Sequence, residues 1–155
     1  MAKLAVIRLR SGINANEDVR DTMKIVGLTK INHCILVDDS DAVLGMLQKA
    51  KDYITWGEAT PQTIEHLLRR WGRLSGNRRL TDEEVKSKGA FQSIKDFADA
   101  ISSGKAGISS LPGLKKVFRL HPPRKGFKST KRPFKDFGDL GYRGEKINDL
   151  IIRMA

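Results

Sequence analysis

The chain has 155 residues, which is enough for one domain with a hydrophobic core of ordinary size. Its 29 Lys and Arg against 18 Asp and Glu give a formal net charge of +11, which indicates a polyanionic partner, either nucleic acid or an acidic membrane surface. We expect neither a transmembrane span, because no apolar run approaches about 18 residues, nor a secretory signal. The single cysteine, Cys34, cannot form an intramolecular disulfide, which favours an intracellular location.

The first predicted element is a strand over residues 3–10, whose partly alternating pattern gives one apolar face and a second face that becomes polar at its end. A short amphipathic helix follows, with Asn16 as its N-cap and Gly27 as its C-cap.

Residues 33–39 predict a buried strand, since a run of four apolar residues is bounded by charge. The next helix ends near Asp52, and residues 53–56, YITW, have strand composition. The N-cap of this helix is one of three neighbouring polar residues, Asp39, Ser40 or Asp41. The first 57 residues therefore predict the order β-α-β-α-β.

The pattern becomes predominantly helical after residue 58. Thr60-Pro61 is a good helix start, and an apolar stripe follows it, formed by Ile64, Leu67, Leu68 and Trp71. A capping-box pattern begins at Thr81, and a second stripe repeats at helical spacing, formed by Phe91, Ile94, Phe97, Ala98 and Ile101. The terminal sequence EKINDLIIRM predicts a last helix that packs back on the body through Ile147, Leu150, Ile151 and Met154.

Residues 100–135, called the basic segment below, contain no acid and carry +10 of the net charge of +11. The cations are Lys105, Lys115, Lys116, Arg119, Arg124, Lys125, Lys128, Lys131, Arg132 and Lys135. A charge run is often only a solvated face, but such a face normally mixes signs. Prolines and glycines prevent a regular helix, so the segment is expected to run extended or looped along a partner.

Aromatic side chains are interleaved with these charges, as expected where bases stack while Lys and Arg neutralise phosphates. They are Phe118, His121, Phe127 and Phe134. The alternative is that Phe118 and Phe134 simply anchor the segment to the core. A membrane surface would favour a continuous amphipathic helix, which the prolines forbid, so RNA is the better partner.

Nothing in the sequence requires an enzyme. His33, His66 and His121 have no zinc-like spacing, and no phosphate-binding loop or nucleophile turn occurs. The glycines of GDLGYRG, residues 138–144, predict a turn. We therefore predict no catalytic residues, no metal and no cofactor.

The sequence also resembles a known family over nearly its whole length. The N-terminal motifs KLAVIRLRSG, GLTKINH, VDDSDAVLGML and DYITWGE resemble the short bacterial large-subunit ribosomal protein L-thirty. The C-terminal sequence HPPRKGFKSTKRPFKDFGDLGYRGEKINDLIIRM is similar to archaeal and eukaryotic members. Eukaryotic members carry a basic arm before the core, whereas here the first strand begins two residues after Met1, which favours an archaeal source.

The resemblance implies an α+β fold with a ferredoxin-like β-α-β-α-β core, a helical insertion and a basic, loop-rich extension. The expected ranges are 1–58 for the core, 59–103 for the insertion, and 104–155 for the basic segment and terminal helix. The implied function is that of a structural constituent of the large ribosomal subunit, a cytoplasmic monomer within the ribosome that binds ribosomal RNA and neighbouring proteins and touches no membrane. Two alternatives are an RNA-binding regulator or chaperone acting off the ribosome and an RNA-processing enzyme.

We predict that the RNA contacts are concentrated in the basic segment. There they comprise Lys115, Lys116, Arg119, His121, Arg124, Lys125, Phe127, Lys128, Lys131, Arg132 and Lys135. Secondary candidates elsewhere are Arg8, Arg10, Arg69, Arg70, Arg73, Arg78, Arg79 and Arg143. Contacts to phosphates and 2′-hydroxyl groups would read RNA shape rather than base sequence.

Overall fold

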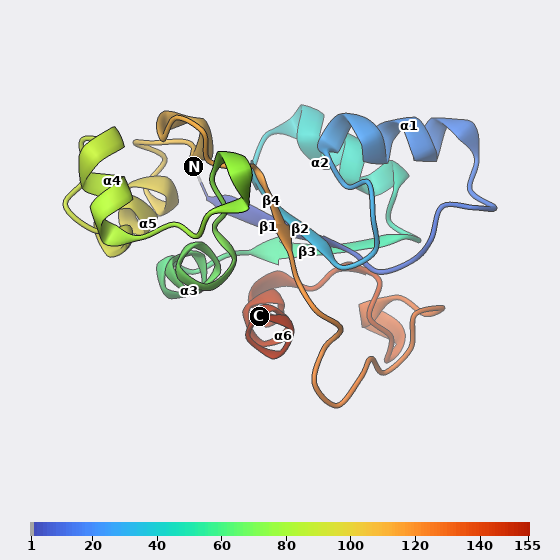
Figure 1. Cartoon of the computed structure of the whole chain (residues 1–155). Coiled ribbons are helices and arrows are strands. Elements are labelled where there is room, and N and C mark those ends of the chain that lie inside the picture. The colour runs from blue at the N-terminus through green and yellow to red at the C-terminus, as the bar shows by residue number, and fades with distance from the viewer. Residues whose placement is uncertain (1) are drawn as a thin grey trace.

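The β-α-β-α-β order predicted for the N-terminal part is confirmed by a computed structural model, which describes residues 2–155. Within that range a mixed sheet has the strand order β4-β2-β1-β3-β5 (Figure 1). The strands are β1 Lys3–Arg8, β2 His33–Asp38, β3 Ile54–Glu58, β4 Val117–Arg119 and β5 Gly141–Tyr142. The α-helices are α1 Glu17–Val26, α2 Asp41–Lys49, α3 Pro61–Trp71, α4 Asp82–Lys88, α5 Ile94–Ser102 and α6 Ile147–Met154.

The central strand β1 is buried along its whole length because helices cover both faces of the sheet. Leu4 and Val6 face the layer under α1 and α2, and Ala5 and Ile7 face α3, α5 and α6 (Figure 1). β1 pairs antiparallel with both β2 and β3, so β2 and β3 run in the same direction with β1 between them. This α+β arrangement is compatible with a ferredoxin-like core.

Most of the predicted helix ends are confirmed. Gly27 ends α1 in the left-handed conformation at φ 98°, and the Ser40 hydroxyl caps α2. Thr60 caps α3. The prediction for Asn16 is only partly right: it occupies the N-cap position of α1, but its side chain makes no capping hydrogen bond. Acids in the first turn complement the helix dipole there instead.

Strands β4 and β5 were not predicted. β4 pairs antiparallel with β2, opposite residues 33–35, and β5 pairs in parallel with β3. Both strands are too short to carry a period-two pattern, and β5 lies in the sequence that predicted only a turn, whose Gly141 indeed has a positive φ of 78°. The chain after residue 104 therefore returns twice to the sheet.

Helices from the second half complete the core. The apolar stripes of α3, α5 and α6 are buried together with one face of the sheet and with Phe118 of β4. α3 lies against both α5 and α6 below the sheet, while α4 and α5 extend to one end of the molecule (Figure 1). One hydrophobic cluster thus includes residues from all three ranges expected from the sequence.

Candidate nucleic-acid interface

The basic segment lies along the protein's own body. After β4, the Leu120 N–H donates to the Asn32 carbonyl at 3.1 Å, which fixes the segment to the end of β2. The N–H groups of His121 and Arg124 donate to the last carbonyls of α6, those of Met154 and Arg153, each at 3.1 Å. The backbone is therefore held in place by the fold, although its prolines exclude a regular helix.

All ten cations of the basic segment are exposed, and none forms an ion pair with a carboxylate of residues 2–155. Elsewhere several cations do have acidic partners, among them Lys3, Arg69, Arg78 and Lys88. Unpaired charges of one sign repel one another, so a surface of this kind is best suited to a polyanion.

Arginines from outside the segment gather at the C-terminal end of α3. They line a hollow of about 460 Å³ together with aromatic rings, and its lining is His66, Arg69, Arg70, Trp71, Arg73 and Arg79. Arg73 and Arg79 lie directly opposite each other in a short antiparallel bridge. Like charges in that position are destabilising without a counter-charge. We call this feature the arginine hollow.

The basic segment reaches the arginine hollow at two points. The Lys115 N–H donates to the Arg73 carbonyl at 2.8 Å, and the His121 ring lies edge-on to Trp71 at 6.3 Å between centroids. The Trp71 Nε1–H is buried and has no hydrogen-bond partner within residues 2–155. Two predicted groups of cations that are far apart in the sequence are thus brought together.

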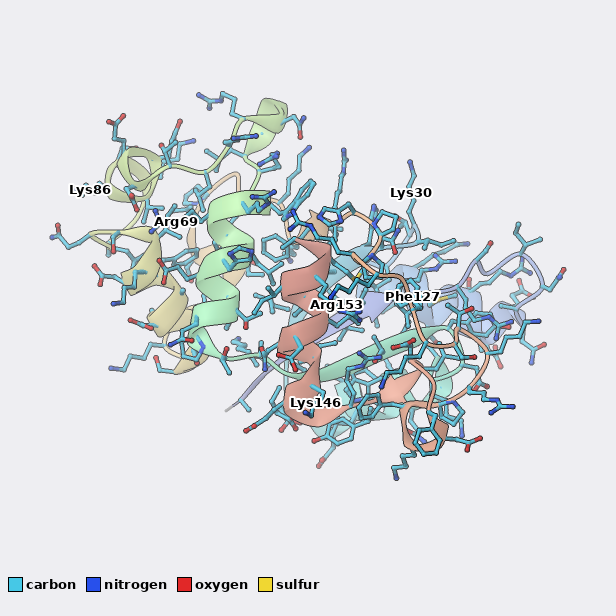
Figure 2. All side chains as sticks on the ribbon, turned by 90° about the horizontal axis from the view of Figure 1, so that it is seen from below. Lys30, Arg69, Lys86, Phe127, Lys146 and Arg153 are labelled. Atoms are coloured by element: carbon cyan, nitrogen blue, oxygen red, sulfur yellow. The ribbon has the colours of Figure 1, made fainter. Side chains whose placement is uncertain are left out.

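Further positive charges lie around His33, at the start of β2 and beside the basic segment. Burial lowers the pKa of His33, and the nearby charges of Arg119, Lys30 and Arg8 lower that pKa further. Lys30 was not a predicted contact, yet its side chain extends outward from the body (Figure 2). On the other side of the segment, Arg153 of α6 donates to the carbonyls of Arg124 and Gly126, beside Phe127 (Figure 2).

A buried carboxylate shapes the loop that carries the last four cations of the segment. Asp139 Oδ2 accepts the N–H groups of Lys128 at 2.6 Å and Ser129 at 3.1 Å, and Oδ1 accepts Arg143 Nη2–H at 2.8 Å. Gly138 is required beside it, because a Cβ there would overlap the Arg132 carbonyl. The buried Asp139 carboxylate therefore holds the backbone of the loop, while the cations of the loop are exposed to solvent.

The aromatic side chains of the segment differ in their surroundings. Phe118 is fully buried, so the anchoring alternative holds for it. Phe127 is half-buried against the core, and Phe134 is half-buried with the Arg143 guanidinium 4.9 Å from its ring centroid. Just after the segment, Phe137 is 82% exposed, and the sequence did not single it out.

Two predicted contacts, Arg8 and Arg143, are instead buried structural residues. The Arg8 guanidinium donates to the Leu28 carbonyl at 2.8 Å, and burial lowers the pKa of this side chain. Arg143 donates to Asp139 and to Thr55 Oγ1 at 3.0 Å. The sequence placed Arg8 on the polar end of a strand and Arg143 in a turn, and nothing in it indicated that this turn folds back against β3.

The remaining candidates are dispersed. Arg10 lies 5.3 Å from the centroid of the Tyr53 ring, and Arg78 is paired with Glu84. Lys116 lines a hollow near the Asp38 end of β2, close to Lys105, which was not a predicted contact, whereas Arg119 lies opposite His33 at the other end. Arg69 points from α3 toward α4, where it approaches Asp82 (Figure 2). Lys30, His66, Trp71 and Arg153 were not among the predicted residues, because only the fold brings them near the segment, whereas Phe137 follows the segment directly and was not singled out.

Other kinds of site have no support in the described chain. Across residues 2–155, no three His, Cys, Asp or Glu side chains are grouped so that they could hold a metal ion. None of the helices in this range has both the length and the apolar character needed to cross a membrane.

Known proteins resemble this chain over almost its full length. A family model described as ribosomal protein L30p/L7e matches residues 4–54. The large ribosomal subunit protein uL30 of Archaeoglobus fulgidus is 47% identical over 150 residues, which is 97% of this chain and 98% of the relative. Proteins of the same name from Methanoregula boonei and Methanocorpusculum labreanum are 46% and 45% identical, again over 97% of this chain and 98% of each relative.

The chain belongs to the uL30 family. The family model ends at the first residue of β3, but the matches to uL30 relatives extend across the basic segment and α6. The archaeal type of uL30 expected from the sequence is confirmed by these relatives. The uL30 family consists of ribosomal proteins, which are structural components rather than enzymes.

Proposed function

We propose that this chain is a structural constituent of the large ribosomal subunit that binds and stabilises large-subunit ribosomal RNA and so contributes to translation. The uL30 relatives support the assignment to the large subunit. The observation that carries the RNA contact is the set of ten exposed cations without acidic partners in residues 2–155, held on a backbone that the fold has already ordered.

The proposed RNA-binding surface combines the basic segment with the arginine hollow, and it adds Lys30 and Arg153. Lys and Arg would neutralise phosphates and release counterions, so the affinity should fall steeply with salt. Extended, irregular backbone with outward cations suits the recognition of RNA shape through phosphates and 2′-hydroxyl groups. Arg8 and Arg143 act within the fold and are left out of this surface.

We further propose a division of roles along the chain. Residues 1–58 form a ferredoxin-like frame, residues 59–103 are a helical insertion, and residues 104–155 supply the basic, loop-rich extension and the helix that returns to the core. In the particle the chain would be a cytoplasmic monomer between ribosomal RNA and neighbouring large-subunit proteins. The division of roles is supported by the hydrophobic cluster that the three ranges share, because this cluster packs the RNA-binding extension onto the ferredoxin-like frame.

The proposal is tested by replacing Arg124, Lys125, Lys128, Lys131 and Arg132 with Ser. Incorporation into large subunits should fall. The slope of log affinity for large-subunit ribosomal RNA against log salt should become shallower by about 4 units, since each neutralised phosphate contributes about 0.7 to 0.9.

A matched control removes the same charge from α1, α2, the turn after α2, and α4. It replaces five exposed cations with Ser, namely Arg20, Lys24, Lys49, Lys51 and Lys86. If both variants assemble alike and show equal salt slopes, net charge explains the binding and the proposed surface is wrong. Sedimentation addresses the alternative of a role off the ribosome, which predicts much of the protein outside ribosomal fractions.

A further inference from the structure

Phe137 is an aromatic side chain in an unusual position. It is 82% exposed, and its backbone is in the left-handed region at φ 55° and ψ 28°. Large side chains rarely adopt that conformation, and strain of this kind persists mainly where the surrounding structure imposes it, often at functional sites. The other non-glycine residues with positive φ within residues 2–155 are Asn32, Asn77 and Lys125, and of these the two asparagines tolerate the conformation well.

Backbone hydrogen bonds of the loop hold the main chain of Phe137 in this conformation. The N–H groups of Asp136 and Gly138 both donate to the Pro133 carbonyl at 2.9 Å, which closes a tight turn around the residue. Behind the turn, the Asp139 and Leu140 N–H groups donate to the Arg132 carbonyl at 3.1 and 3.2 Å. Because the backbone is already ordered, binding through the Phe137 ring costs no ordering of the loop, which suits a stacking contact.

The charges around the ring indicate what it would meet. Lys131, Arg132 and Lys135 are exposed on the same loop, and Asp136 is the exposed acid beside them. An apolar pocket of a protein partner would have to desolvate this excess of cations, whereas RNA offers an unpaired base beside phosphates that neutralise them. An exposed aromatic ring among cations is a common arrangement for binding unstacked nucleotides.

We propose that Phe137 is a stacking platform for an unpaired nucleobase of the ribosomal RNA, fixed by the Pro133–Leu140 turn. The inference rests on the proposed function and adds the class of contact at this position. The loop would then make two kinds of contact with RNA: stacking through Phe137, and ionic contacts to phosphates through the neighbouring cations.

The test measures the affinity of Phe137 variants for deproteinised large-subunit ribosomal RNA as a function of salt. Phe137→Ala, Phe137→Leu and Phe137→Gly should each weaken binding about tenfold, with an unchanged salt slope, because stacking involves no counterion release. Phe137→Trp should bind at least as tightly as the native chain. Phe137→Gly should unfold at no lower temperature, since glycine relieves the strain, which separates lost binding from lost folding.

The control is Ile25→Ala on α1, a residue that is 75% exposed, and it should bind like the native chain. A photoreactive phenylalanine analogue at position 137 should cross-link to a nucleotide in assembled subunits. A cross-link to a protein, or native affinity in both Phe137→Ala and Phe137→Leu, would overturn the inference. If the native chain itself fails to bind the RNA, the proposed function fails instead, so the two failures are distinguishable.

Discussion

Asp139 connects the interior of the molecule with the loop that carries Lys128, Lys131 and Arg132. Its carboxylate is buried with Arg143, and removal of one partner from such a pair leaves an uncompensated charge. We expect Asp139→Asn to lower the free energy of unfolding by about 3 kcal/mol, measured by chemical denaturation. Asp136→Asn, an exposed neighbour, should change it by less than about 0.5 kcal/mol. Equal effects of the two variants would contradict the structural role of Asp139.

His33 should make the folded protein less stable as the pH falls. Its pKa in the native state lies below the ordinary 6.5, first because of burial and then because of Arg119, Lys30 and Arg8. The unfolded chain therefore takes up the proton at higher pH than the native chain, so the contribution is present above about pH 6.5 and is lost as the pH falls below it. Between pH 7 and pH 5 the native chain should lose more stability than His33→Gln, followed as the unfolding temperature. Parallel curves would exclude His33 as the cause.

At the scale of single elements, β4 fixes the basic segment to the sheet. Phe118 lies fully buried between β2 and the helices below, so Phe118→Ala should lower the free energy of unfolding by about 3 to 5 kcal/mol. Phe118→Leu should have a smaller effect because it keeps most of the apolar volume. Amide hydrogen exchange would show whether β4 opens with the whole molecule. Exchange of β4 amides as fast as in an unstructured loop would contradict this anchoring role.

The predictability of these elements depended on their length. α1, α3, α5 and α6 carry several apolar residues at helical spacing, so periodicity alone located them. β4 and β5 consist of three and two residues, and their partners are distant in the sequence. Only tertiary pairing defines such strands.

The candidate interface was predictable in composition but not in arrangement. The absence of acids from residues 100–135 is visible in the sequence, and those ten cations are all exposed. Burial of Arg8 and Arg143 depends on carbonyl and carboxylate groups supplied by Leu28 and Asp139, which no local pattern indicates. Exposure of Phe137 likewise follows from a turn closed by backbone hydrogen bonds.

For the whole molecule, the unpaired charge predicts opposite effects of salt on folding and on binding. In the free protein, ions screen the repulsion among the cations of the basic segment, so raising KCl from about 0.05 M to about 0.5 M should raise the unfolding temperature by roughly 3 °C. RNA binding should weaken over the same range. The variant with five Ser substitutions in the segment should show a smaller rise in calorimetry, and an equal rise would refute this explanation.

The positions of β4 and β5 at the two borders of the sheet also bear on how the chain is made. Residues 2–58 alone would leave β2 and β3 as open edges, with backbone groups free to pair with another copy. Synthesis proceeds from the N-terminus, so both edges stay open until residues 117–142 have emerged. Arg119 then lies on the outer strand, and a charged edge resists further pairing. The late segments therefore also protect the newly made protein from self-association.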